Sequence, residues 1–353
     1  MSVHDLASTL AERLRDASAR GTPLRLAGGD TKRFYGRPVT GDTLDLRDHA
    51  GVVNYDPAEL VLTVRCGTRL ANIDTLLAAN GQRLPFDPPR HGVDATIGGA
   101  IAAGLAGPSR PRQGAVRDHV QGVRLLTGDG RSMRFGGEVL KNVAGYDVAR
   151  LMAGSLGILG VLLELSLRVL PRPMADLTLV FDVDGAAALD RVGRWSGTSL
   201  PLVASTWVAG RLYARFEGTD ATLAAVHRQE GGETLAHGAS FWTSVRDQTH
   251  PFFAGATRLW RLHVPGGGGF PLAGDAALVE WQGAQWWYHD RADADLRAVA
   301  AAAGGTATLF RGATEQEEVF APLTPPVLRL HRALKKVFDP AGILNPGRMY
   351  AGL

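Results

Sequence analysis

The stretch "ATIGGAIAAGLAGP" at residues 95–108 consists almost entirely of residues without side-chain chemistry. It holds four glycines and five alanines, and Thr96 carries its one hydroxyl group. Gly98 and Gly99 would let the backbone approach a bound anion more closely than a Cβ atom allows, and the two later glycines would let the next turn pack beneath it. Tight helix packing explains such a cluster equally well if the stretch is taken alone.

An earlier loop, "AGGDTK" at residues 27–32, has the same character and begins within the predicted short strand "LRLAGG" at residues 24–29. Its glycines expose backbone N–H groups, which can form an anion-binding nest. Two such segments in one chain indicate a diphosphate. No G-x-G-x-x-G or G-x-x-x-x-G-K-[ST] motif occurs, and "GSLGILG" at residues 154–160 precedes a strand instead of opening a helix. These observations disfavour NAD and ATP as ligands.

Composition excludes several other classes of protein. The chain has 353 residues, 45 % of them hydrophobic, which suits a globular protein of two or three domains. Its net charge of +3 comes from scattered Arg without a run of like charges, so we expect no nucleic-acid partner. With one cysteine, Cys66, and dispersed histidines we expect neither a disulfide nor a metal site. Because a signal-peptide core and a spanning apolar run are both absent, we expect a cytoplasmic protein.

Hydrophobic periodicity predicts helices and strands in alternation through the first half of the chain. Leucines at helical spacing in the first 20 residues predict an N-terminal helix. Residues 120–126 and 161–169 are predicted strands. In the second of these, Leu and Val alternate with Glu164, Ser166 and Arg168, which predicts one buried and one exposed face.

Prolines 171 and 173 indicate a domain boundary. All seven tryptophans of the chain follow this boundary, so the composition changes there. We therefore expect a first domain, a second domain and a C-terminal helix with its tail, at residues 1–173, 174–326 and 327–353.

Several segments carry a resemblance to a known family. "AGGDTK", "ATIGGAIAAGLAGP", "GAVRDHVQG", "KNVAGYD" and "FDPAGILNPGR" occur in the order seen in flavoproteins of the vanillyl-alcohol oxidase superfamily, and together they resemble the FAD-binding E subunits of bacterial glycolate oxidases. The resemblance covers residues 24–173 and the tail from residue 327. It implies an α+β fold: a two-part PCMH-type FAD-binding domain, a smaller α/β cap domain, and a C-terminal tail that returns to the FAD domain.

The resemblance also implies which residues bind FAD. In that superfamily the first loop and the "TIGG" segment hold the pyrophosphate, so their backbone N–H groups are expected to face two phosphates. The "RDHVQG" segment runs past the flavin and adenine, and the lysine of "KNVAGYD" either neutralises charge near the flavin or is a solvated surface residue. The implied cofactor-binding residues are Ala27, Gly28, Gly29, Asp30, Thr31, Lys32, Thr96, Ile97, Gly98, Gly99, Ala103, Gly104, Asp118, Val120, Lys141, Asn142, Gly160 and Val161.

The sequence departs from the superfamily pattern at two positions that bear on how FAD is bound. Where related dehydrogenases have Gly-Ser-Glu-Gly-Thr-Leu-Gly, this chain has apolar Leu156 and Ile158, so polar contacts are lost there. Members with covalent flavin often carry a histidine in or near the first loop, and here that loop carries Asp30. The resemblance therefore implies noncovalent FAD.

A catalytic site is harder to find. Oxidation of a 2-hydroxy acid by flavin requires a base for the hydroxyl proton and a cation for the carboxylate. The histidines of the second domain form no His-x-His or His-His-Gly cluster. Arg258 and Arg261, with Trp260 between them, suit a carboxylate site or equally a strand with Arg outward and Trp inward. The catalytic residues stay unknown.

Three functions remain open. The chain resembles a subunit of an FAD-dependent oxidoreductase that oxidises glycolate to glyoxylate beside a catalytic flavin subunit and an iron–sulfur subunit, in the cytoplasm and at the inner membrane face through these partners. The alternatives are a free-standing FAD-dependent 2-hydroxy acid dehydrogenase and a scaffold with a vestigial flavin site. The absent histidine cluster favours the first.

The stretch "WQGAQWWYHD" at residues 281–290 is a candidate contact with another subunit. Aromatic residues are enriched at the centres of protein interfaces, and this part of the chain holds more tryptophan than its size requires. The same residues equally suit the core of the second domain. If they form the contact, Trp286→Ala would weaken assembly and leave bound FAD unchanged.

Overall fold

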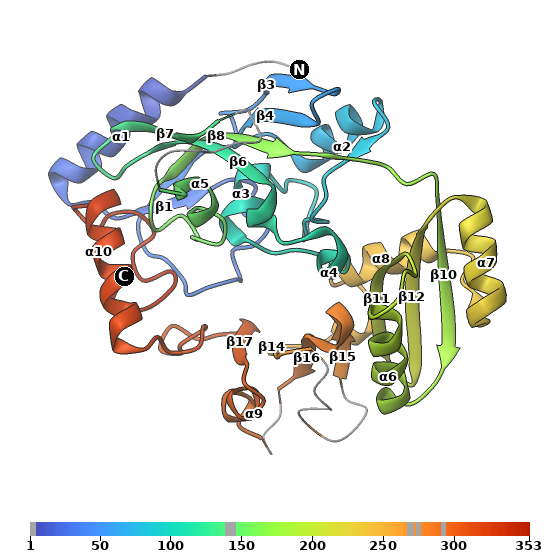
Figure 1. The fold of residues 1–353 in the computed structure, drawn as a ribbon. Coiled ribbons are helices and arrows are strands. Elements are labelled where there is room, and N and C mark those ends of the chain that lie inside the picture. Colours follow the sequence, from blue (N-terminus) through green and yellow to red (C-terminus); the bar gives the residue numbers. More distant parts are fainter. Residues whose placement is uncertain (1–4, 138–145, 267–271, 273–276, 291–293) are drawn as a thin grey trace. The chain divides into compact units, whose positions relative to one another are not determined.

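The computed structural model describes residues 5–137, 146–266, 272, 277–290 and 294–353. It divides the chain into two compact units (Figure 1). The first contains Met1–Leu105, Ala115–Pro171 and Thr314–Leu353, and the second contains Ala106–Gly114 and Arg172–Ala313.

These units differ from the expected domains in two places. Residues 106–114 belong to the second unit, because Trp281 donates a hydrogen bond from its indole Nε1 to the carbonyl of Gly107 (3.0 Å) and lies beneath the guanidinium of Arg110. The returning tail begins at residue 314 instead of 327. The side chain of Arg37 binds the carbonyls of Glu315 and Glu317, which holds the start of this tail on the first unit.

The first unit is built around a five-stranded antiparallel sheet with the strand order β3-β4-β8-β6-β7. The bounds are β3 Val52–Asp56, β4 Val61–Arg65, β8 Val161–Arg168, β6 Val120–Leu126 and β7 Ser132–Gly136. Two small sheets accompany it: parallel β1 (Leu24–Ala27) with β2 (Asp42–Asp45), and antiparallel β5 (Gln82–Arg83) with β9 (Leu170–Pro171).

The central strand β8 corrects one expectation. Its polar face was predicted to be exposed, but Glu164 and Ser166 are buried, because β8 lies between two neighbouring strands and is covered on both faces. The charge of Glu164 is compensated by Arg124 and Arg134, each 3.1 Å from one of its carboxylate oxygens. A buried carboxylate paired in this way avoids the cost of an isolated charge.

Two helices of the first unit end at a glycine in the left-handed conformation. The N-terminal helix α1 (Ala7–Arg20) buries its leucine stripe and stops at Gly21, which adopts the left-handed conformation with φ 64°. In α3 (Ile97–Ala103), Thr96 caps the N-terminus and Gly104, with φ 65°, closes the C-terminus. The other helices are α2 (Leu70–Ala78), the 3₁₀ helix η1 (Val116–His119), α5 (Val148–Leu151) and α10 (Pro325–Phe338).

The second unit consists of an eight-stranded antiparallel sheet with helices. The strand order is β13-β10-β12-β11-β15-β16-β14-β17. Its strands are β10 Ala175–Asp182, β11 Leu202–Val208, β12 Arg211–Gly218, β13 Glu233–Thr234, β14 Leu259–His263, β15 Ala277–Glu280, β16 Gln285–His289 and β17 Thr306–Arg311. Its helices are α4 Arg110–Gln113, α6 Gly185–Ser196, α7 Asp220–Glu230, α8 Gly238–Arg246, η2 Pro251–Phe253, η3 Trp281–Gly283 and α9 Leu296–Ala302.

Most tryptophans of the second unit are buried inside it, which favours the core of the domain over a subunit contact for the tryptophans of residues 281–290. Six of the seven are buried within this chain, and Trp260 is half-buried. Trp286 is 0 % exposed and donates a hydrogen bond to the carbonyl of Gly283 (2.7 Å). A side chain without accessible surface cannot contact another subunit. Trp195, Trp207 and Trp286 belong to the hydrophobic core cluster of this unit.

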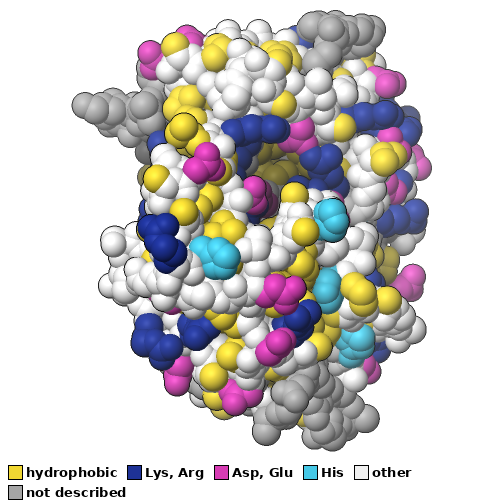
Figure 2. Space-filling model, turned by 90° about the vertical axis from the view of Figure 1, so that its right-hand side faces the viewer, with side chains coloured by type: hydrophobic (Ala, Val, Ile, Leu, Met, Phe, Trp, Pro, Cys, Tyr) yellow, Lys and Arg dark blue, Asp and Glu magenta, His cyan; other side chains and the backbone are white. Residues whose placement is uncertain are grey.

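Charged side chains are dispersed on the face drawn in Figure 2, where Lys and Arg lie in small groups with Asp and Glu between them. This arrangement agrees with the scattered Arg of the sequence. Among the described residues, no helix has the length and apolarity needed to cross a lipid bilayer.

Candidate functional site

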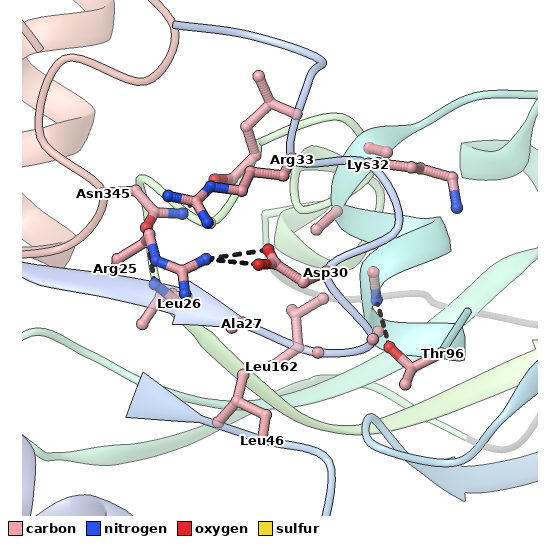
Figure 3. A pocket seen from close by; sticks show the side chains of 18 of the residues that line it. Arg25, Leu26, Ala27, Asp30, Lys32, Arg33, Leu46, Thr96, Leu162 and Asn345 are labelled. Carbon is pink, nitrogen blue, oxygen red and sulfur yellow. Dashed lines mark hydrogen bonds and ion pairs between the residues drawn. The ribbon is translucent and has the colours of Figure 1, made fainter. Parts of the chain in front are cut away.

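The first unit contains a pocket at the end of β1 (Figure 3). It encloses ≈ 930 Å³ of empty space, including its opening to solvent. Three parts of the chain meet there: the loop after β1, helix α3 and the C-terminal tail. The lining residues are Arg25, Leu26, Ala27, Gly28, Gly29, Asp30, Thr31, Lys32, Arg33, Tyr35, Val39, Leu46, Cys66, Thr96, Gly98, Gly99, Ala102, Ala103, Leu156, Gly157, Gly160, Leu162, Asn345 and Arg348.

The loop after β1 presents a row of available hydrogen-bond donors. Within the part of the chain that the structure describes, the backbone N–H groups of Gly28, Gly29, Asp30 and Thr31 donate to no protein acceptor. Consecutive N–H groups of this kind attract an anion. The loop therefore has the donor set that the sequence predicted for a phosphate nest.

Gly28 and Gly29 also allow this loop to pack against the segment before α3. A Cβ atom on Gly28 would overlap the hydroxyl of Thr96, and one on Gly29 would overlap the carbonyl of Asp94. The two glycine-containing segments, about 70 residues apart in the sequence, are thus in direct contact. Their glycines serve protein packing as well as ligand approach.

The N-terminus of α3 differs from the expectation. The N–H groups of Ile97 and Gly98 already donate to the carbonyls of Thr68 (2.9 Å) and Cys66 (2.8 Å), and that of Gly99 donates to the Thr96 hydroxyl (3.2 Å). The second set of N–H groups, which was predicted to bind phosphate, therefore donates to acceptors within the protein. This segment therefore lets a ligand come close to its backbone, but it provides no free N–H donors.

Gly99 is the residue that provides this approach. Its neighbours in the first turn of α3 are buried, whereas Gly99 is exposed and lines the pocket. A Cβ atom there would meet one protein atom, the Thr96 hydroxyl at 3.3 Å, so packing does not require glycine. At Gly98 a Cβ atom would lie 2.6 Å from Cys66 Cβ, so packing does require it. The absence of a side chain at Gly99 leaves room for a ligand.

The charges that line the pocket favour an anion. Four cations, Arg25, Lys32, Arg33 and Arg348, accompany one carboxylate, Asp30, among the described lining residues. Asp30 accepts both of its ion-pair hydrogen bonds from Arg25, at 2.9 and 3.0 Å (Figure 3). The remaining excess of positive charge suits a diphosphate.

The C-terminal tail supplies residues that the site assignment from sequence missed. Arg348 donates to the carbonyls of Arg37 (2.9 Å), Lys32 (3.2 Å) and Arg33 (3.1 Å), and burial lowers the pKa of its guanidinium to about 10. Asn345 accepts the N–H of Leu26 (2.8 Å). The tail thereby holds the loop after β1 in place.

Lys335 of α10 also holds the C-terminal tail on the first unit. Its buried ammonium donates to the carbonyls of Ile158 (2.8 Å) and Leu344 (2.6 Å) and lies 2.7 Å from the carboxylate of Asp339. The motif "FDPAGILNPGR" at residues 338–348 was the sequence signal for this part of the site, but nothing local in it indicates which loop it reaches.

The structure brings most of the predicted binding residues together and separates others. Ala27 to Lys32, Thr96, Gly98, Gly99, Ala103 and Gly160 line the pocket. Five others have structural positions instead: Ile97 is buried in α3, Gly104 ends α3, Asp118 accepts the N–H of Ala115 (2.8 Å), and Val120 and Val161 are buried at the starts of β6 and β8. Lys141 and Asn142 lie outside the described residues.

The second unit offers no catalytic constellation among its described residues. Arg258 pairs with Asp290 (3.3 Å), and Arg261 is buried over the rings of Trp287 and Phe310. Of the two alternatives, a strand with Arg outward therefore does not hold for Arg261. His263 is buried, which lowers its pKa to about 3 and keeps it neutral. No group of three or more His, Cys, Asp or Glu in the described chain is arranged to hold a metal ion.

A buried carboxyl group, Glu280, lies in the same unit. It accepts hydrogen bonds from Trp287 Nε1 (2.6 Å) and Gln285 Nε2 (2.9 Å). Burial raises its pKa to about 7, although both hydrogen bonds act in the opposite direction. Gln285 in turn is 2.9 Å from a ring nitrogen of His263, so these side chains form one polar network inside the unit.

Comparison with known proteins agrees with this site. A family described as "FAD binding domain" matches residues 6–136, and one described as "FAD linked oxidases, C-terminal domain" matches residues 280–349. The glycolate oxidase subunit GlcE of Escherichia coli (strain K12) is 45 % identical over 350 residues, which cover 99 % of each chain. The glycolate oxidase subunit GlcD of Bacillus subtilis (strain 168) is 31 % identical over 172 residues, 48 % of this chain and 35 % of GlcD.

A solved structure of alkyldihydroxyacetonephosphate synthase resembles the whole chain, with a TM-score of 0.67 over 96 % of this chain and 74 % of the other, at 16 % identity. This likeness concerns the fold and confirms the expected α+β, PCMH-type class. The free N–H row and the excess positive charge fit a pyrophosphate, and the bare backbone at Gly99 leaves space for it. The chain belongs to the family of FAD-linked oxidases that includes the glycolate oxidase subunit GlcE, and FAD is its cofactor.

Proposed function

We propose that this chain is the FAD-binding subunit of a complex that oxidises glycolate to glyoxylate, together with a catalytic flavin subunit and an iron–sulfur subunit. The observation that carries the proposal is the 45 % identity to GlcE over 99 % of both chains. The complex is assigned to the cytoplasm and, through its partners, to the inner face of the membrane.

FAD, when bound, supplies the acceptor for a hydride or electrons. The chain's own residues bind and orient it. The N–H groups of residues 28–31 and the cations Arg25, Lys32 and Arg348 bind the pyrophosphate, and Gly99 leaves room beside it. Asn345 holds Leu26 of β1, and Arg348 holds Lys32 and Arg33 of the loop that lines the pocket.

We propose noncovalent attachment of the FAD. The described lining residues include no histidine. Cys66 lines the pocket, but burial raises the pKa of its thiol to about 12, so it stays protonated and is a poor nucleophile. Acid or heat denaturation should therefore release all of the yellow colour.

An accessory role is supported by what the second unit holds. Its described residues present no histidine cluster, and both candidate arginines are engaged in contacts within the unit.

The test is to purify the chain alone and with the co-expressed partner subunits. The isolated chain should contain FAD, release it in acid, and reduce no dye when glycolate is added. The complex should reduce dye with glycolate. If the isolated chain oxidises glycolate as fast as the complex, it is a free-standing dehydrogenase. If neither preparation holds FAD, the scaffold with a vestigial site is correct.

A further inference from the structure

Asp30 is an unexpected residue in a loop with the donor set of a phosphate nest. Within the described chain, the N–H groups of residues 28–31 donate to no protein acceptor, and Asp30 is the one carboxylate among the described residues that line the pocket. A carboxylate beside a phosphate opposes binding through like-charge repulsion. Anion binding alone therefore does not explain why this loop carries an acidic side chain.

The backbone conformation at Asp30 does not explain it either. Its φ of 54° lies in the left-handed region, which glycine and asparagine also adopt. Gly28 and Gly29 precede it directly, so the loop already contains the residue type that adopts this region most easily. A neutral residue would meet the conformational requirement without the repulsion.

The carboxylate of Asp30 forms an ion pair with Arg25 (Figure 3). Nη1 of Arg25 donates to both carboxylate oxygens, at 2.9 and 3.0 Å, and Nη2 donates to the hydroxyl of Thr43 at 3.0 Å. The side chains of Arg25 and Asp30 are 18 % and 39 % exposed, so solvent screens their charges only in part. The pair fixes one of the cations that line the pocket and offsets its charge.

Asp30 also lies where its charge acts on a bound phosphate. Its own N–H group is one of the four free donors, so a phosphate that accepts this N–H lies close to the carboxylate of the same small residue. A second cation senses the same charge: burial lowers the pKa of the Arg348 guanidinium to about 10, and Asp30 acts in the opposite direction. The carboxylate thus reduces the positive potential at the centre of the loop.

We propose that Asp30 is a specificity-determining residue of the FAD site, an inference that rests on the placement of the pyrophosphate in the proposed function. Its carboxylate discriminates against nucleotides that end in a free phosphate, such as ADP and ATP. Each phosphate of FAD is esterified and carries one negative charge, whereas a terminal phosphate carries about 1.5 to 2 charges near pH 7. Repulsion by Asp30 therefore weakens the binding of ADP and ATP more than that of FAD.

A purely structural role for the ion pair makes a different prediction. If Asp30 served only to hold Arg25 and the loop, loss of either partner would weaken the binding of FAD, ADP and ATP in similar proportion. If the charge of Asp30 discriminates, loss of Asp30 and loss of Arg25 change the preference in opposite directions, because the two charges have opposite sign.

The test is a calorimetric titration of the apoprotein of the full chain with FAD, ADP and ATP. Asp30→Asn keeps the size of the side chain and permits the left-handed conformation, and it should lower the ratio of the ATP and FAD dissociation constants at least about fivefold. The ratio for ADP should fall by less. Arg25→Met should raise both ratios. The matched control, Asp16→Asn, removes the same charge from an exposed position on α1 and should leave both ratios unchanged.

Thermal unfolding of each apoprotein reports whether the variant folds, and Asp30→Gly replaces Asp30→Asn if the latter does not. Unchanged ratios in the Asp30 variant would overturn the proposal, as would changes of the same sign in the Asp30 and Arg25 variants. If ADP and ATP bind to none of the proteins, other features of the pocket exclude them and the role of Asp30 is wrong. If the wild-type apoprotein binds no FAD, the proposed function itself is wrong.

Discussion

Substitution of Gly99 should change FAD binding and protein stability in opposite directions. Gly99 is the third residue of α3, and its φ lies outside the left-handed region, so alanine fits the backbone. Alanine in place of glycine in a helix is worth about 0.5–1 kcal/mol, with the lower end applying in a first turn. The contact with the Thr96 hydroxyl at 3.3 Å requires a small adjustment. We expect Gly99→Ala to raise the free energy of unfolding of the apoprotein by about 0.5 kcal/mol.

In the binding mode proposed here, the same Cβ atom would occupy space beside the pyrophosphate. We expect Gly99→Ala to weaken the binding of FAD at least tenfold, which corresponds to a loss of about 1.4 kcal/mol in binding free energy. The larger Gly99→Val should bind no measurable FAD. The measurements are a titration of apoprotein with FAD, followed by flavin fluorescence, and calorimetric unfolding of the same apoprotein.

Gly98→Ala is the matched control. Its Cβ atom would lie 2.6 Å from Cys66 Cβ and 2.8 Å from the Cys66 carbonyl oxygen, so it should lower the unfolding temperature and lose FAD through loss of structure. A Gly99→Val protein that folds and keeps a full complement of FAD at wild-type affinity would refute the placement of the pyrophosphate at α3.

Three further predictions concern other parts of the chain. Trp286→Ala should lower the free energy of unfolding in urea by about 3–5 kcal/mol, because it leaves a cavity in the core of the second unit; unchanged stability with weakened assembly would restore the interface hypothesis. Burial raises the pKa of Glu280 to about 7 in the folded protein, so the folded state binds the carboxyl proton more strongly than the unfolded state does. The stabilisation from this proton is complete below about pH 4.5 and is lost, by about 3 kcal/mol, between about pH 4.5 and 7. Glu280→Gln should therefore flatten the dependence of the unfolding free energy on pH in that range. Arg348→Met should weaken the binding of FAD at least tenfold in the same titration, and Arg348→Lys should weaken it less, because lysine retains the charge but not the three hydrogen bonds. Equal affinity for FAD in both variants would mean that the tail does not support the pocket.

Local features of the sequence were sufficient for much of the first unit. The helix that ends at Gly21, the strand before the first glycine loop and the strand at residues 120–126 were all predicted from periodicity and turn residues. The glycine loop at residues 27–32 was identified as an anion nest because the relevant property, a run of exposed N–H groups, depends on a few consecutive residues.

The hydrogen-bond partners of α3 could not be predicted in the same way. Whether the N–H groups of Ile97 and Gly98 face a ligand or the protein depends on the loop at residues 66–68, which supplies the carbonyls they bind. The burial of Glu164 likewise depends on Arg124 and Arg134, which reach it from neighbouring strands. Periodicity describes one element at a time and contains no information about such partners.

Through its resemblance to a known family, the sequence alone predicted the α+β class and the FAD cofactor, and its glycine spacing predicted a diphosphate-binding loop, because such motifs are properties of neighbouring residues. Only the tertiary structure decided that Asn345 and Arg348 complete the pocket, more than 300 residues after the loop they hold. It also decided that most tryptophans are buried in the second unit and that Val327, Leu330 and Val337 of α10 stay exposed. These outcomes depend on which surfaces pack together, and that choice is made by the burial of apolar area over the whole chain.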